Sequence, residues 1–129
     1  MGDAAAVLDA SALMALLNME PGADVVDRLV PDAAISSVNW CEAYGKLRAR
    51  GVDALPLTES MAETGIAVLG FDELDAHRAG ELLAPTRSAG LSLADRACLA
   101  LAARLDVPAV TADRAWRDLD IGVEIVCIR

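Results

Sequence analysis

Short apolar runs alternate with longer helical segments along the whole chain, and this pattern constrains the fold most. Each run is rich in Ala, Val, Leu or Ile. Parallel strands need long crossover connections, usually helical, and strands covered on both faces are apolar throughout. The pattern therefore predicts an α/β/α sandwich: a parallel four- to five-stranded sheet with helices on both faces. The candidate strands are Ala5–Leu8, Ala33–Ser36, Ala67–Phe71, Pro108–Thr111 and Val123–Ile128.

The predicted helices begin and end at ordinary local signals. Ser36 or Ser37 caps a helix that Gly51 ends, and Pro56 is placed like a first-turn residue. Between two of the helices, Pro85–Gly90 is expected to be a loop. The predicted helices are Ser11–Asn18, Asp24–Val30, Ser36 or Ser37 to about Arg50, Pro56–Thr64, Asp72–Leu83, Ser92–Leu105 and Arg114–Leu119.

The chain has 129 residues, which predicts one domain over 1–129. Its hydrophobic content of 55% excludes intrinsic disorder. Charges, Gly or Pro interrupt each apolar run before the roughly 20 residues that a membrane span needs. The N-terminus has no basic residue of the kind that opens a secretory signal. We therefore expect a cytoplasmic domain with no membrane contact. Cys41, Cys98 and Cys127 lie at wide spacings in apolar stretches, so we expect buried, unpaired thiols.

The formal charge of −9 argues against binding nucleic acid through a broad basic face. It does not exclude an enzyme that handles phosphate through bound cations. His77 is the only histidine and lies in a segment typical of a solvated helix face. Hydrolases with a Ser-His-Asp or Cys-His arrangement, and zinc sites, are therefore not expected.

Four acidic residues follow the carboxyl ends of predicted strands or open the next helix, where open parallel sheets bind ligands. The aspartates have a structural alternative. Asp9 and Asp113 could cap helices, and Asp95 could form a capping box with Ser92. Glu42 lies about two turns into its helix, too far from the helix start to cap it. The four acids are Asp9, Glu42, Asp95 and Asp113.

Acids gathered at one sheet edge would repel one another by roughly 4 kcal/mol per close pair at intermediate dielectric. Divalent cations would relieve that repulsion. Hard oxygen ligands without His or Cys select Mg²⁺ or Mn²⁺. One or two such ions can activate water and stabilise a leaving oxygen in phosphodiester cleavage. The pattern therefore favours a nuclease.

The four acidic motifs resemble those of the PIN-domain ribonucleases, specifically the VapC-type toxins of bacterial toxin–antitoxin pairs. VLDASAL, SSVNWCEAYGKL, the TRSAGLSLADRACLALA stretch and VTADRAW follow in the family's order and span nearly the whole chain. The resemblance implies a PIN-like sandwich and Mg²⁺- or Mn²⁺-dependent hydrolysis of RNA, leaving a 3′-hydroxyl and a 5′-phosphate. It also implies a homodimer and a neutralising VapB-type antitoxin.

The resemblance assigns roles to the matching acids. Asp9 and Asp95 are the expected metal ligands, Asp113 completes the site, and Glu42 ligates or orients the attacking water. Some relatives carry a further acid at the position where this chain has Ala115. Asp118 is the next acid along the chain.

Neighbouring polar residues also match the family. Ser11 and Thr111 occupy small-hydroxyl positions where they could orient carboxylates, or equally serve in caps and turns. Arg96 and Arg114 directly follow site aspartates and are candidates for contacts with RNA phosphates or for pairing with acids of the protein.

Two alternatives stay open. The chain could be a non-catalytic PIN-like module that binds antitoxin or RNA. It could also be another Asp-based phosphoryl-transfer domain. A haloacid-dehalogenase-type phosphatase would need Asp where Ser11 stands, and a response-regulator receiver would need a lysine after a late strand, whereas Lys46 lies elsewhere.

Overall fold

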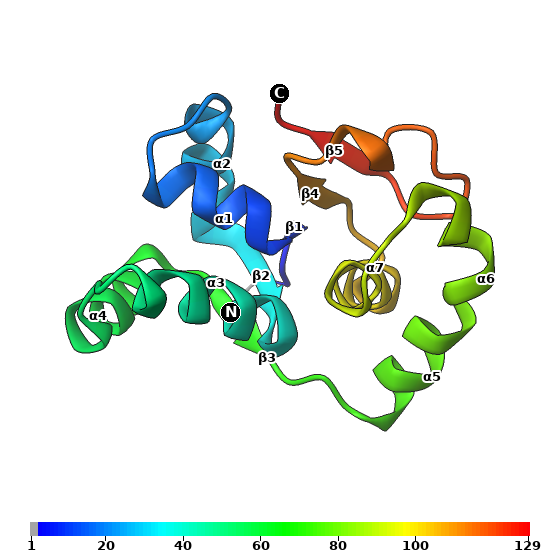
Figure 1. Cartoon of the computed structure of the whole chain (residues 1–129), viewed down its shortest axis with the longest axis horizontal. Coiled ribbons are helices and arrows are strands. Elements are labelled where there is room, and N and C mark those ends of the chain that lie inside the picture. The colour runs from blue at the N-terminus through cyan, green and yellow to red at the C-terminus, as the bar shows by residue number, and fades with distance from the viewer. Residues whose placement is uncertain (1–2) are drawn as a thin grey trace.

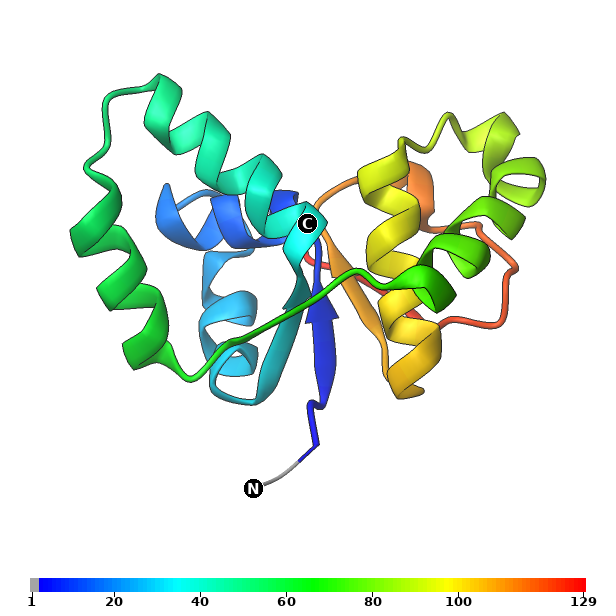
Figure 2. The same cartoon turned by 90° about the horizontal axis from the view of Figure 1, so that it is seen from below.

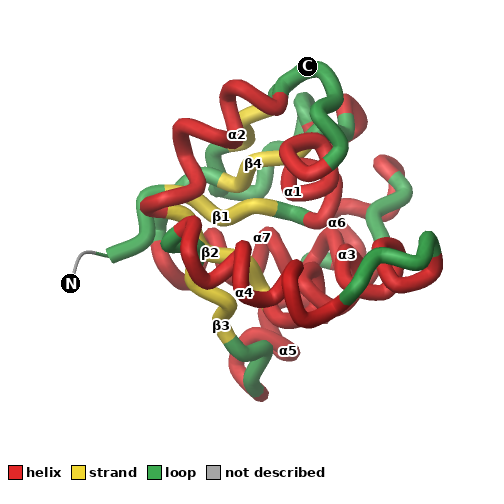
Figure 3. The backbone as a smooth tube through the Cα atoms, turned by 90° about the vertical axis from the view of Figure 1, so that its left-hand side faces the viewer, coloured by secondary structure: helices red, strands yellow, loops and turns green. Residues whose placement is uncertain are grey.

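The computed structural model describes residues 3–129 and contains a five-stranded parallel sheet in the order β3-β2-β1-β4-β5. Figure 3 shows β3, β2, β1 and β4 following one another across the sheet. The predicted parallel sheet is confirmed, although each strand except β2 is shorter than expected. The strands are β1 (Ala6–Leu8), β2 (Ala33–Ser36), β3 (Ala67–Leu69), β4 (Ala109–Thr111) and β5 (Ile125–Cys127).

Helices cover both faces of this sheet (Figures 1 and 2). In Figure 2, α1 to α4 lie to the left of the strands and α5 to α7 lie to the right. The α-helices are α1 (Ala10–Leu17), α2 (Ala23–Leu29), α3 (Ser37–Ala49), α4 (Ala54–Thr64), α5 (Glu73–Glu81), α6 (Leu83–Thr86) and α7 (Leu93–Leu105). Three 3₁₀ turns cover Val30–Asp32, Arg87–Ala89 and Arg114–Trp116 of the described chain. The predicted α/β/α sandwich is confirmed.

Side chains of the central strand, β1, point alternately to the two faces of the sheet, so the core has two layers. Ala6 and Leu8 pack into the cluster formed with α1 to α4, whereas Val7 packs into the cluster formed with α7. All three side chains are buried. Successive strand residues point to opposite faces, so a strand covered on both sides must be apolar throughout. This is why β1 shows no polar alternation in the sequence.

The order of the strands creates a topological switch point between β1 and β4. From β1 the chain builds outward to β2 and β3, and it later returns to the other side of β1 to build β4 and β5. Leu8 of β1 lies in register with Ile35 of β2 and Val110 of β4. The residues that follow β1 and β4 therefore meet at one edge, where ligands of open α/β sheets bind.

The expected loop over Pro85–Gly90 is wrong, because most of it is helical. α6 and the turn Arg87–Ala89 continue from α5 through Leu82, whose backbone is itself helical. Pro85 falls in the first turn of α6, where its missing N–H is not needed. Thr86 donates from Oγ1 to the carbonyl of Leu82, four residues earlier, at 2.7 Å.

The expectation of three buried thiols holds only for one cysteine. Cys98 is buried and Cys127 half-buried, but Cys41 is exposed. The inner face of α3 is formed by Asn39, Ala43 and Leu47, so position 41 falls on the opposite side of the helix. Within residues 3–129, no helix has both the length and the apolar character needed to cross a membrane.

Candidate functional site

Asp9 occupies the switch point directly after β1, and its carboxylate is held on both oxygens. Oδ1 accepts hydrogen bonds from the backbone N–H of Ala12 at 2.8 Å and from the Ser11 hydroxyl at 2.7 Å. Oδ2 accepts from the Thr111 hydroxyl at 2.6 Å. The side chain caps α1 as the sequence allowed, and it is only 3% exposed. The residue therefore combines a capping role with a buried, fixed carboxylate.

The hydroxyls beside Asp9 join β1 to the loop after β4. Ser11 Oγ accepts from the backbone N–H of Ala112 at 2.9 Å, and Thr111 Oγ1 accepts from that of Asp113 at 3.0 Å. Each hydroxyl donates to Asp9 while accepting from this loop, which fixes the proton of each hydroxyl toward the carboxylate. Ser11 and Thr111 thus both hydrogen-bond to Asp9, and their role as orienting groups in a metal site stays a prediction.

Asp95 and Asp113 also serve as helix caps. Asp95 Oδ2 accepts from the backbone N–H of Ser92 at 2.9 Å, which completes the capping box of α7. Asp113 Oδ1 accepts from the backbone N–H of Ala115 at 2.9 Å. Each cap uses one carboxylate oxygen and leaves the other outside the cap. The capping interpretation is therefore correct for these residues. In each of them the second carboxylate oxygen takes no part in the cap and could bind a ligand.

The electrostatics at this edge are dominated by the burial of Asp9. Burial raises the pKa of its carboxyl from 3.8 to about 6, while the hydrogen bonds it accepts lower the pKa in part. The negative charge of Asp95 raises it further, so these two carboxyls lie close enough to interact. Burial, followed by the charges of Asp9 and Asp95, also raises the pKa of the Cys98 thiol well above its usual range. The buried Cys98 thiol therefore stays protonated and adds no charge near Asp9 and Asp95.

Glu42 is half-exposed on α3, and its Oε2 lies 3.9 Å from Nζ of Lys46. One turn earlier on the same helix is Asn39, which the sequence reasoning missed. Its Nδ2 donates to the carbonyl of Ala94 at 3.0 Å, across to the first turn of α7. The available signal was an amide on the otherwise apolar inner face of α3, three residues before Glu42.

The carboxylates of Asp9, Asp95 and Asp113 are the type of ligand that a hard divalent cation binds. Their positions do not, however, form a complete coordination site. Within residues 3–129, no three His, Cys, Asp or Glu side chains are arranged to hold a metal ion. In the same part of the chain, the ion pairs include none with Asp9, Asp95 or Asp113. Asp9 is thus a buried carboxylate with a second acid nearby and no basic partner, which is costly without counter-charge. An oxygen-only donor set of this kind fits Mg²⁺ or Mn²⁺.

The two arginines that follow site aspartates differ in their surroundings. The Arg96 guanidinium donates to the carbonyl of Ala79 at 2.8 Å, and this bond ties α7 to α5. Arg114 is exposed and its Nε donates to the carbonyl of Arg129 at 3.3 Å. Neither forms an ion pair with an acid of the described residues.

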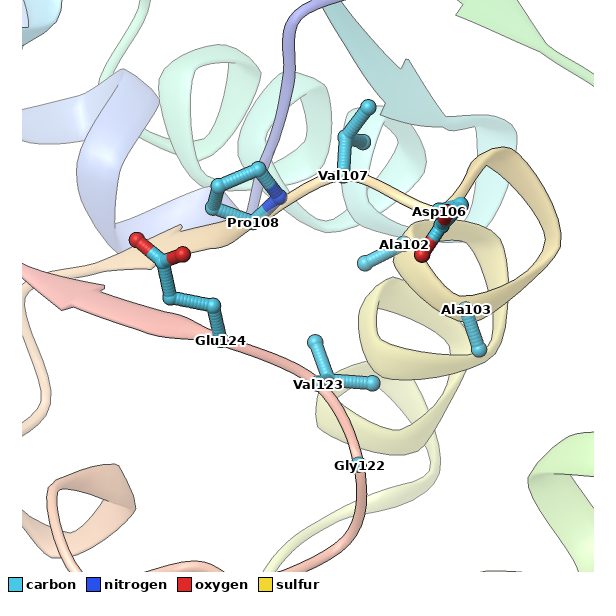
Figure 4. Close-up of a pocket in the computed structure, with 8 residues that line it drawn as sticks. All are labelled: Ala102, Ala103, Asp106, Val107, Pro108, Gly122, Val123 and Glu124. Atoms are coloured by element: carbon cyan, nitrogen blue, oxygen red, sulfur yellow. The ribbon is translucent and has the colours of Figure 1, made fainter.

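A pocket of about 260 Å³ lies at the opposite edge of the sheet (Figure 4). Its walls include the end of α7 at Asp106 and the residues just before β4 and β5, Pro108 and Glu124. It is therefore separate from the acidic edge, because that edge follows the carboxyl ends of the strands.

The fold and this edge define a class: an α/β/α protein with a buried acidic residue at the switch point of a parallel sheet. Within that class, the chain belongs to the PIN-domain family, whose model matches residues 6–122. No curated protein matches the chain.

Solved structures with the same fold include toxin–antitoxin proteins. A toxin–antitoxin complex from Klebsiella pneumoniae has a TM-score of 0.73 at 20% identity, covering 96% of this chain and 98% of that one. A DNA-bound VapBC from Salmonella typhimurium has a TM-score of 0.70 at 19% identity, covering 95% and 96%. VapC20 of Mycobacterium tuberculosis, described as a Sarcin-Ricin loop cleaving toxin, has a TM-score of 0.67 at 17% identity, covering 92% and 98%. At these identities the likeness shows a shared fold.

Proposed function

We propose that this chain is the toxin of a type II toxin–antitoxin pair and hydrolyses RNA phosphodiester bonds with Mg²⁺ or Mn²⁺. The observation that carries the proposal is Asp9. It is buried at the switch point, oriented by Ser11 and Thr111, and lies near Asp95 without a basic partner. A protein that only needed a helix cap there would gain nothing from burying a charge.

Each of the four acidic residues has its own proposed role. Asp9 and Asp95 would hold the cation, and Asp113 would complete its coordination directly or through water. When bound, the ion supplies positive charge for the phosphate oxygens and makes a bound water more acidic. Glu42 either joins the ligands or accepts a hydrogen bond from the attacking water. Water adds to phosphorus and the bond to the 3′ oxygen breaks, which leaves a 3′-hydroxyl and a 5′-phosphate.

A strongly acidic protein must hold RNA through a few local bases. Arg114 suits such a contact, because it is exposed beside Asp113. Arg96 suits it less well, since its guanidinium already bonds to the backbone of α5. We therefore assign RNA-phosphate contact to Arg114 and a structural role to Arg96.

The proposed partners are a VapB-type antitoxin and a second copy of the chain. Structures of the same fold are described as toxin–antitoxin and VapBC complexes, which supports such an assembly here. The acidic edge offers a site for a basic antitoxin side chain, which would compete with the cation for the same carboxylates.

The test is cleavage of total RNA by the purified chain in Mg²⁺, compared with the same reaction in EDTA and with Asp9→Asn. Cleavage in Mg²⁺ that both EDTA and the variant abolish is expected. Cleavage that persists in EDTA, or in the variant, would contradict the proposal, because contaminating or metal-independent nuclease would then explain it.

A non-catalytic binding module is the second candidate, and it is favoured by the absence of an assembled ligand set within residues 3–129. Such a module would bind antitoxin or RNA with or without divalent cations. Association that is insensitive to EDTA, together with no cleavage in Mg²⁺ or Mn²⁺, would select it.

A further inference from the structure

The side chain of Asn39 is 1% exposed and only half satisfied. Its Nδ2 donates to the carbonyl of Ala94, while its Oδ1 is buried without a hydrogen-bond partner among the residues described. Rotating the amide would not repair this, because Oδ1 would then face the Ala94 carbonyl as a second acceptor. A buried acceptor left unpaired costs at least as much as one such hydrogen bond gains. The amide therefore brings no evident net gain in stability.

The bond from Asn39 connects two elements that carry site residues. Asn39 lies one turn before Glu42 on the inner face of α3, and Ala94 immediately precedes Asp95 in the first turn of α7. Residues three apart on a helix share a face, so moving Asn39 relative to Ala94 also moves Glu42 relative to Asp95. The Asn39–Ala94 bond is thus one contact that fixes α3, which carries Glu42, against the start of α7, which carries Asp95.

We infer that Asn39 is a positioning residue that fixes Glu42 on α3 relative to Asp95 on α7 for the binding of a divalent cation. This inference rests on the proposed metal site. Metal sites depend on such supporting contacts, and losing one typically costs 10- to 100-fold in affinity. The Asn39 side-chain amide adds little to the stability of the fold. Its effect on the positions of Glu42 and Asp95 would explain its presence.

The test is Mn²⁺ titration by calorimetry, with thermal melting measured on the same samples in EDTA. Asn39→Leu keeps the number and branching of side-chain heavy atoms but removes the donor and the unpaired acceptor. We expect its melting temperature to stay within about 5 °C of the wild type. We expect its dissociation constant for Mn²⁺ to rise about ten-fold. Asn39→Ala carries the same expectation for Mn²⁺ if the leucine does not fit.

Thr86→Val is the matched control. Thr86 is equally buried and donates from its side chain to a backbone carbonyl, but on α6. Its Mn²⁺ affinity should equal that of the wild type. Wild-type affinity in both Asn39 variants would overturn the inference while leaving the metal site intact. A wild-type chain that takes up no Mn²⁺ would instead overturn the proposed function and this inference with it.

Discussion

The hydroxyl of Thr111 donates a 2.6 Å hydrogen bond to Oδ2 of Asp9, across the point where the strand order of the sheet reverses. The two residues are far apart in the chain, and both are buried. The same hydroxyl accepts from the backbone N–H of Asp113, so it orients one acid and anchors the loop of another. Thr111 therefore couples two residues of the candidate site.

Thr111→Val is the first test of that coupling, because valine keeps the branched shape and suits a strand. The change leaves Oδ2 of Asp9 and the N–H of Asp113 without this partner. The free energy of unfolding should fall by about 1–3 kcal/mol. RNA cleavage should fall by about 10- to 100-fold. Denaturant melts and a cleavage assay measure the two effects.

Thr58→Val is the control for this change, since Thr58 is exposed and donates only to a backbone carbonyl within α4. It should leave both measurements near the wild-type values. Unchanged cleavage by Thr111→Val would mean that this hydroxyl does not orient the reacting groups.

Asp9→Asn should remove the pH dependence that the buried Asp9 carboxyl gives to the stability of the metal-free protein. The pKa of Asp9 is raised by burial from 3.8 to about 6, so the fold holds its proton more tightly than the unfolded chain does. Its contribution to stability is therefore complete below about pH 4 and is lost as the pH rises through 6. A rise from 3.8 to about 6 corresponds to about 3 kcal/mol.

Thermal melts in EDTA between pH 4 and 8 measure this effect. The wild type should lose stability relative to Asp9→Asn as the pH rises from 4 to 8. Parallel stability curves for the two proteins would show that Asp9 is not destabilised by its burial.

Asp75→Ala tests the contact that fastens α5 to α7. Asp75 is 2% exposed and accepts from Nε and Nη2 of Arg104 at 2.9 and 3.2 Å. Because Arg104 keeps access to water, losing its charge-assisted hydrogen bonds to Asp75 should cost about 1.5–3 kcal/mol of unfolding free energy. Asp24→Ala, which breaks an exposed pair with Arg28 at 3.9 Å, should cost at most about 1 kcal/mol. Similar urea midpoints for the two variants would contradict this account of the α5–α7 contact.

Gly22→Ala probes a close approach between the α1–α2 connection and the C-terminal strand region. Gly22 has φ +95°, and a Cβ there would lie 2.7 Å from a side-chain atom of Ile128 and 2.8 Å from its carbonyl oxygen. Backbone strain and steric overlap in Gly22→Ala should together lower the free energy of unfolding by about 1–3 kcal/mol or more. Gly45→Ala on α3 meets no atom within 4 Å and should stabilise by about 0.5–1 kcal/mol. Melting temperatures that move in the same direction for both would refute the steric explanation.

Most of the architecture could be predicted from the sequence because burial on both faces leaves a strong local signal. Runs such as Ala33–Ser36 are wholly apolar until a capping serine, and the observed strand has the same bounds. The helical turn over Leu83–Thr86 was missed, because Pro85 resembles a loop signal unless its place in the first turn is known.

The candidate site was harder to predict than the fold. The sequence indicated which acids follow strands, but a capping aspartate and a ligand aspartate look alike, and Asp9 serves as a cap while buried beside Asp95. Asn39 was not predicted, because its role rests on a hydrogen bond to the carbonyl of Ala94, which lies far along the chain. Pairings of this kind depend on tertiary contacts that no local pattern records.

The central claim is that a divalent cation binds among Asp9, Asp95 and Asp113. Anomalous diffraction from crystals soaked in Mn²⁺ tests it most directly. The account predicts a strong peak at the edge beyond β1 and β4, within about 2.0–2.2 Å of a carboxylate oxygen of Asp9 or Asp95. A fully soaked crystal with no peak at this edge, or with its peaks only elsewhere on the molecule, would contradict it.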